Sequence, residues 1–199
     1  SYAQYALGRK DPTLMQKALE RAYANGKEAA EVCQRLLSFG RGDDLGQTCM
    51  VSDVVEASLK CLVRNPAKDN IELQLEVAED LVVEVEPCLL QQVIYNLIIN
   101  ARDAMLGRPG RLKIAAGREA GQVYIRVTDT GGGIPAEVLP RIFDPFFTTK
   151  NNSDSKRGGS GLGLAVSRHI IGRVGGKISV QSEPGRGTTF IITLPAAGP

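Results

Sequence analysis

The chain has 199 residues, of which 43% are hydrophobic and 23% charged. These values fit one well-buried globular domain with a small appendage, and they exclude collagen-like, disordered and disulfide-scaffold chains. Lys and Arg total 24 and Asp and Glu total 22, so the net charge of +2 gives no reason to expect nucleic acid or a membrane surface as partner. The most apolar run, residues 87–101, is interrupted by four amides and does not fit a membrane span. Four cysteines without a CxxC pair, and one histidine, argue against structural zinc.

The N-terminal part is expected to form a long helix. Apolar residues recur at three- and four-residue steps from Met15 to Leu36, which predicts a helix over residues 13–39 with charged residues on its opposite face. Such a stripe needs burial, either against the rest of this chain or in a helical bundle with another copy. A stretch rich in Gly and Asp then predicts a linker at 41–50.

From residue 51 onward, helical and strand patterns alternate, which indicates an α+β domain over 51–199. In chain order we expect a helix over 53–64 capped by Asp53, strands over 71–77 and 81–85, a mostly buried helix over 87–105, a hairpin of strands 112–117 and 123–128, an irregular stretch over 131–160, a helix over 162–174 and a closing hairpin of strands 177–182 and 188–194.

Asn96 and Asn100 lie one turn apart on the otherwise apolar helix over 87–105. They are either surface amides bonded to solvent or functional groups beside a buried stripe, where an unpartnered amide is costly. An amide oxygen is also a good ligand for Mg²⁺, with waters and phosphate oxygens at the other positions.

The segment VTDTGGGIP, residues 127–135, places Asp129 at a strand end before three glycines. Glycine lets the backbone approach a flat ligand closely, and the carboxylate can accept from an exocyclic amino group, which adenine presents at its sixth ring position. The alternative is a glycine-rich turn with an Asx cap. The dinucleotide fingerprint is rejected, because no repeated βαβ unit follows.

The segment GGSGLGLAV, residues 158–166, opens the next helix with repeated glycines. Free amides at a helix start form an anion cradle, although a flexible loop leading into a helix is the alternative. Between Arg141 and Lys177 there are seven basic and two acidic side chains, and 151–160 has almost no apolar residues. We expect a mobile basic lid here, in which Lys150 can reach a polyphosphate.

Together, the successive segments NLIINARDAM, DTGGGIP, DPFFTTK, GGSGLGLA and EPGRGTTF closely resemble the catalytic, ATP-binding domain of two-component sensor histidine kinases, most closely the nitrogen-regulation-type subgroup. The resemblance covers about residues 51–195. It implies a two-layer α/β sandwich of the Bergerat type, with a mixed sheet against three helices. LLSFGR, at the end of the predicted first helix, resembles the end of the dimerisation and phosphoacceptor hairpin, so residues 1–40 are expected to be its C-terminal part.

The resemblance also implies ATP and Mg²⁺ as cofactors. Asn100 would ligate Mg²⁺, Asn96 would lie near the phosphates, and Asp129 would read adenine. The remaining nucleotide-binding residues it implies are Arg102 or Asp103, Gly131, Gly133, Ile134, Lys150, Gly159, Ser160, Gly161, Leu162, Gly163, Leu164 and Thr188.

Two departures from the family pattern matter. ATP-hydrolysing cousins of the fold have a glutamate where this chain has Asn96, which cannot activate water, so transfer to a protein acceptor is favoured over hydrolysis. The family's acceptor histidine is absent and is expected upstream of Ser1, while His169 is expected to be a partly buried structural residue.

We therefore expect a kinase region that passes the γ-phosphoryl of ATP to a histidine and then to a response-regulator aspartate. The resemblance implies a homodimer through the N-terminal helices, a receiver domain as partner, no contact with nucleic acid or membrane, and a cytoplasmic location with any membrane anchor upstream. The alternatives are a nucleotide-binding or dimerising module without kinase activity and an ATPase of the related fold.

Overall fold

The computed structural model describes residues 16, 47–62, 65–149 and 160–197. Apart from residue 16, which is helical, the predicted helix over 13–39 lies outside these residues, as do residues 41–46 of the predicted linker. The last two residues of that predicted linker, Cys49–Met50, form a short strand instead. The described part contains β1 (Cys49–Met50), α3 (Val51–Lys60), the 3-10 turn η1 (Pro66–Asp69), β2 (Ile71–Val77), β3 (Val82–Val83), α4 (Pro87–Ala104), β4 (Gly110–Glu119), β5 (Gln122–Asp129), the 3-10 turn η2 (Leu139–Arg141), α5 (Gly163–Arg173), β6 (Lys177–Glu183) and β7 (Gly187–Pro195).

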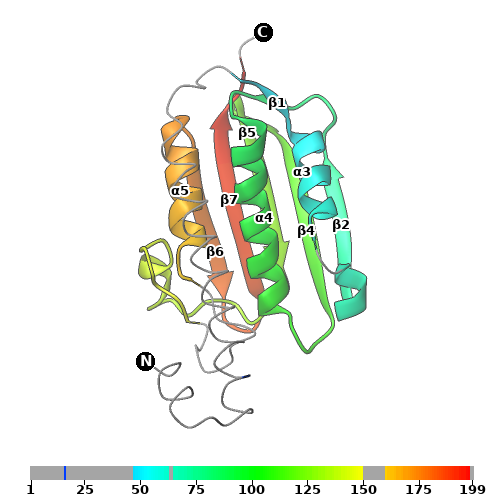
Figure 1. Ribbon diagram of the computed structural model, residues 1–199, viewed down its shortest axis with the longest axis vertical. Coiled ribbons are helices and arrows are strands. Elements are labelled where there is room, and N and C mark those ends of the chain that lie inside the picture. Colours follow the sequence, from blue (N-terminus) through cyan, green and yellow to red (C-terminus); the bar gives the residue numbers. More distant parts are fainter. Residues whose placement is uncertain (1–15, 17–46, 63–64, 150–159, 198–199) are drawn as a thin grey trace.

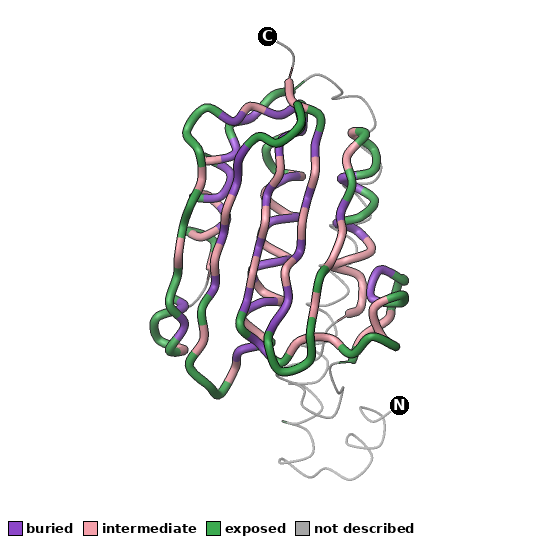
Figure 2. The backbone as a smooth tube through the Cα atoms, turned by 180° about the vertical axis from the view of Figure 1, so that it is seen from behind, coloured by how far each residue is buried: buried purple, intermediate pink, exposed green. Residues whose placement is uncertain are grey.

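The main sheet has the strand order β2-β4-β5-β7-β6 in the described part of the chain. β2 and β4 pair in parallel, and the other neighbours are antiparallel. The helices α3, α4 and α5 cover one face of this mixed sheet (Figure 1), and the opposite face carries no helix among the described residues (Figure 2). The structure is an α+β, two-layer sandwich, as expected. A second small sheet pairs β1 with β3.

The core lies between the sheet and α4, because both present apolar residues at the period of their own backbone geometry. Along β4, β5 and β7, every second side chain points to the helices and is buried. The stripe on α4 consists of Leu90, Val93, Ile94, Leu97, Ile98 and Ala101, all buried. This packing fixes α4, with both of its asparagines, against the centre of the sheet.

Three sequence expectations need correction. The helix expected over 53–64 is α3, which begins at Val51 and ends at Lys60, so Asp53 lies in its first turn and is not the cap. The strand expected over 81–85 shrinks to Val82–Val83, because its partner β1 is only two residues long. Leu73 and Leu75, expected to be on a half-buried face, are 37% and 51% exposed, because β2 lies at the border of the described sheet.

The other predicted helices and strands from residue 71 onward are confirmed with small shifts of their bounds. The hairpin of β4 and β5 turns at Ala120 and Gly121, which both have positive φ, as a two-residue type I′ turn requires. Among the described residues, no helix is both long and apolar enough to cross a membrane.

Candidate functional site

Asp129 is the last residue of β5 and is only 4% exposed. Its Oδ1 accepts a hydrogen bond of 2.7 Å from the backbone N–H of Gly131. Burial raises the pKa of this carboxyl above its usual value, while the backbone N–H groups of Gly131 and Thr188 and the charge of Arg108 act in the opposite direction. Asp129 is therefore a buried acceptor held in one orientation by the backbone around it.

The glycine turn after Asp129 fits tightly between two other parts of the fold. A Cβ atom at Gly131 would lie 2.6 Å from the Cβ of Ala104, at the end of α4. Gly133 has a φ of +70°, and a Cβ there would overlap the carbonyl oxygen of Glu183 in β6. Only glycine allows these close approaches, so the turn packs directly between the end of α4 and the end of β6.

Ser182 joins the closing hairpin to the same turn. Its Oγ accepts a hydrogen bond of 2.8 Å from the backbone N–H of Ile134. The same oxygen lies 3.0 Å from the carbonyl oxygen of Gly187 and 2.9 Å from Oγ1 of Thr188. Thr188 is buried and pairs with Asp129 across β7 and β5. Ile134, Thr188 and Asp129 are thus brought to one place.

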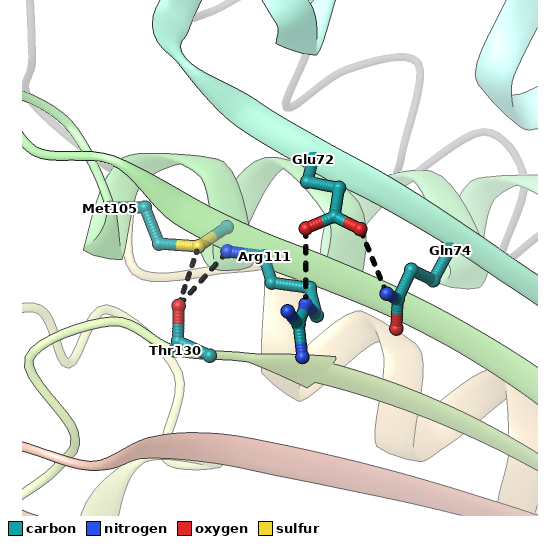
Figure 3. A network of polar contacts seen from close by, with 5 residues as sticks. All are labelled: Glu72, Gln74, Met105, Arg111 and Thr130. Atoms are coloured by element: carbon teal, nitrogen blue, oxygen red, sulfur yellow. Dashed lines mark hydrogen bonds and ion pairs between the residues drawn. The ribbon is translucent and has the colours of Figure 1, made fainter.

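A polar network supports the turn from the other side (Figure 3). The backbone N–H of Arg111 donates to Oγ1 of Thr130 over 2.9 Å, and this hydroxyl also contacts the sulfur of Met105 at 3.8 Å. The side chain of Arg111 bonds to Glu72, which accepts a further hydrogen bond from Gln74. Thr130, next to the buried carboxylate, is therefore bonded to β4 and to Met105 after α4, and Arg111 in turn bonds to β2.

Asn96 connects α4 to the start of α5. Its side-chain amide lies 3.4 Å from both the carbonyl oxygen of Gly163 and Oγ of Ser167. Ser167 is fully buried, and its hydroxyl donates to the same carbonyl over 2.9 Å. Asn100 follows one turn later on α4, and both asparagines are half-buried, at the border of the apolar stripe. The helix that carries both amides is therefore linked directly to the glycine-rich segment.

The start of α5 has the features of an anion-binding helix end. Leu162 is the N-cap residue, and among the described residues its side chain makes no capping hydrogen bond. Its backbone N–H lies 3.4 Å from Oγ of Ser160, and Gly161 has a φ of +68°. Leu164 packs against the core and anchors the first turn. The positive end of the helix dipole thus lies at Gly163, beside Asn96 of α4.

Other predicted residues lie elsewhere or outside the description. Arg102 forms an ion pair of 2.7 Å with Asp69 of η1, while Asp103 is half-buried. Gly159 and Lys150, with the predicted lid, lie outside the described residues. His169, expected to be partly buried, is exposed on α5, because it faces away from the stripe of that helix that packs on α4.

Sequence reasoning did not single out Ser167 or Ser182. For Ser182 a signal was present: a tight turn over 184–186 sets Ser182 opposite Thr188 in the hairpin register. For Ser167 the sequence held little signal, because its partner Asn96 lies 71 residues away in the chain.

A family profile described as "Histidine kinase-, DNA gyrase B-, and HSP90-like ATPase" matches residues 86–198. The chain belongs to this family. The match includes α4, the hairpin of β4 and β5 and the closing hairpin of β6 and β7. Every described residue of the site from Asn96 onward therefore lies within it.

Individual relatives are sensor kinases. The chain is 46% identical over 125 residues to two-component sensor PprA of Pseudomonas aeruginosa, covering 60% of this chain and 13% of that protein. It is 38% identical to sensor kinase CckA of Brucella abortus and 40% identical to sensor histidine kinase ZraS of Salmonella typhimurium, covering 86% and 75% of this chain. The chain spans only 19% and 31% of these two relatives.

Solved structures give the same assignment. The nucleotide-free catalytic domain of histidine kinase ThkA matches with a TM-score of 0.66 and 32% identity, over 75% of this chain and 95% of that one. ThkA in complex with response regulator protein TrrA matches with a TM-score of 0.75 and 26% identity, over 98% of this chain and 57% of that one.

Proposed function

We propose that this chain binds Mg²⁺-ATP between α4, the glycine turn and the start of α5, and presents the γ-phosphoryl for transfer to a histidine. The observation that carries the proposal is the role of α4 as a common support. Ala104 at its end contacts the turn of the buried carboxylate, and Asn96, eight residues earlier, contacts the start of α5. At 1.5 Å per residue, a base site and an anion site are about 12 Å apart along one helix.

In this proposal the adenine amino group donates to Asp129, and the glycine turn lets the base pack on the backbone. The phosphates lie at the start of α5, where helix N–H groups and the dipole stabilise negative charge. The chain contributes positioning and charge neutralisation, which phosphoryl transfer mainly requires.

The side chains fit Mg²⁺ held mainly by the nucleotide. Among the described residues, no group of three or more His, Cys, Asp or Glu side chains could hold a metal ion. A single amide oxygen from Asn100, with phosphate and water oxygens, suits a small hard cation that keeps much of its hydration shell. When bound, Mg²⁺ would neutralise phosphate charge.

The onward acceptor, a histidine in a dimerisation hairpin followed by an aspartate of a response regulator, is part of the proposal. The names of the relatives support it, as does the solved complex of ThkA with TrrA. Asn96 supports transfer over hydrolysis, because an amide has no basicity with which to activate water.

Two measurements test the proposal. Calorimetry with ADP should show binding that requires Mg²⁺ and that is lost in Asn100→Ala, and absence of ADP binding to the wild-type chain would refute the nucleotide site. Incubation with γ-labelled ATP should then label an upstream-extended chain but not this chain alone, with His169→Ala as the control. If the extended chain binds ATP but is not labelled, the alternative of a nucleotide-binding module without kinase activity is favoured.

A further inference from the structure

The hydroxyl group of Ser182 makes three polar contacts, and it can donate its single proton in only one of them. Its oxygen accepts from the backbone N–H of Ile134, and it lies within hydrogen-bond distance of the carbonyl of Gly187 and the hydroxyl of Thr188. A carbonyl oxygen can only accept, so the proton of Ser182 must go to Gly187 if that contact is a hydrogen bond. The contact with Thr188 is then formed by the proton of Thr188.

This arrangement decides what Thr188 can offer to a ligand. Once its single proton points to Ser182, Oγ1 of Thr188 presents only lone pairs elsewhere. Asp129, its partner in the register of β5 and β7, presents only acceptor oxygens when ionised. Neither of the two side chains therefore offers a hydrogen-bond donor to a bound base.

A pair of side chains that presents only acceptors discriminates between purines. Adenine carries an amino group at its sixth ring position, with two protons to give, whereas hypoxanthine and guanine carry a carbonyl oxygen there. A carbonyl facing two acceptors leaves buried acceptors unsatisfied, which is costly. A free proton on Thr188 would remove part of that penalty, because it could be donated to the carbonyl.

We propose that Ser182 is a specificity-determining residue: it takes the hydroxyl proton of Thr188 and thereby leaves only acceptors facing the base. The inference rests on the proposed nucleotide site and assigns its preference for a 6-amino purine partly to a serine behind the binding surface. Ser182 does not contact the base itself and acts through Thr188.

The test compares ADP with inosine diphosphate, which has a carbonyl at the sixth ring position and a proton on the adjacent N1, and which lacks the additional amino group of guanine. In calorimetry the wild-type chain should bind ADP about tenfold or more tightly than inosine diphosphate. In Ser182→Ala this ratio should fall at least about fivefold, mainly through tighter binding of inosine diphosphate. Ser182→Thr, which keeps the hydroxyl, should restore the ratio.

The matched control is Ser179→Ala. Ser179 lies on the same strand, and its hydroxyl contacts the carbonyl of Ile191 at 3.5 Å, away from Thr188. Its removal should leave the ratio unchanged. An unchanged ratio in a folded Ser182→Ala would overturn the inference while leaving the nucleotide site intact, whereas loss of ADP binding in the wild type would refute the site itself.

A second variant covers the case in which Ser182→Ala does not fold. Thr188→Val removes the hydroxyl entirely while keeping the shape. If Thr188 presents an acceptor, this change should weaken ADP binding and leave inosine diphosphate unaffected. If Thr188→Val instead lowers the affinity for inosine diphosphate by a larger factor than the affinity for ADP, or changes neither affinity, then Thr188 donates to the base or does not face it, and the inference is overturned.

Discussion

The side-chain amide of Asn96 lies 3.4 Å from the carbonyl oxygen of Gly163, which is 67 residues away in the chain. This contact joins α4, which carries both asparagines, to the first residue of α5. An amide can donate here, whereas a carboxylate cannot. The asparagine at this position therefore acts as a structural link between the two helices.

The first prediction concerns this link. Asn96→Ala should lower the free energy of unfolding by about 1 kcal/mol, because it removes two long hydrogen bonds but leaves Gly163 bonded to Ser167. Asn96→Asp should cost more, because its carboxylate would face the carbonyl oxygen of Gly163. Urea unfolding checks both values, and equal stability of Asn96→Asp and the wild type would contradict the link.

The second prediction concerns the pH dependence of stability. The pKa of Asp129 is raised above 3.8 in the folded state, mainly by burial. The folded state therefore binds more protons than the unfolded state between that value and the raised pKa, so stability falls as the pH rises through this window and stays lower at neutral pH. Asp129→Asn lacks this dependence.

Relative to the wild type, Asp129→Asn should thus gain stability as the pH rises from 3.8 through the raised pKa, and it should keep that gain at neutral pH. Unfolding curves of both proteins at several pH values measure this difference. ADP binding to the wild type should weaken as the pH falls through the same window, because a protonated carboxyl is a poorer acceptor. Parallel stability profiles of the two proteins would contradict the assignment.

The third prediction compares two glycines. Gly133→Ala should destabilise the protein by about 2 kcal/mol or more, because a positive φ is combined with overlap against Glu183. Gly172→Ala should instead stabilise it by about 0.5–1 kcal/mol, because Gly172 lies inside α5 and, apart from its chain neighbours and the nearby backbone of that helix, no described atom lies within 4 Å of the added Cβ. Thermal unfolding should show shifts of opposite sign.

The fourth prediction concerns the ion pair of Arg102 and Asp69, whose side chains are only 21% and 9% exposed. Arg102→Met and Asp69→Asn should each cost about 1–3 kcal/mol, and the double variant should lose less than their sum. The control is the exposed pair of Lys60 and Glu56, where the coupling should stay below about 0.5 kcal/mol. Equal coupling energies in the double-mutant cycles of the two pairs would show that burial does not strengthen the pair of Arg102 and Asp69.

The elements with long, regular patterns were predictable from sequence. The apolar stripe of α4 and the alternation of β4 and β5 gave their types and nearly their bounds, because burial of one face dictates the residue period. The exposure of Leu73 and Leu75 was not predictable, because alternation shows which face a residue lies on but not whether the strand is at the border of a sheet.

The same limit applies to the site. Asp129 and its glycines form a local pattern, and their close packing follows from it. The pairing of Arg102 with Asp69 and the serine contacts join residues that are distant in the chain or depend on a strand register, so a local motif does not contain them. The sequence therefore identified the groups of the proposed nucleotide site better than those that orient them.

The parallel pairing of β2 with β4 has a consequence for the order of folding. The two hairpins, β4–β5 and β6–β7, close over a few residues, whereas β2 can pair with β4 only after the chain has passed through β3 and α4. Pairing over such a separation carries a larger loop-closure cost and is slow. We therefore expect the hairpins that bear Asp129 and Thr188 to form early, and β2 to join β4 late.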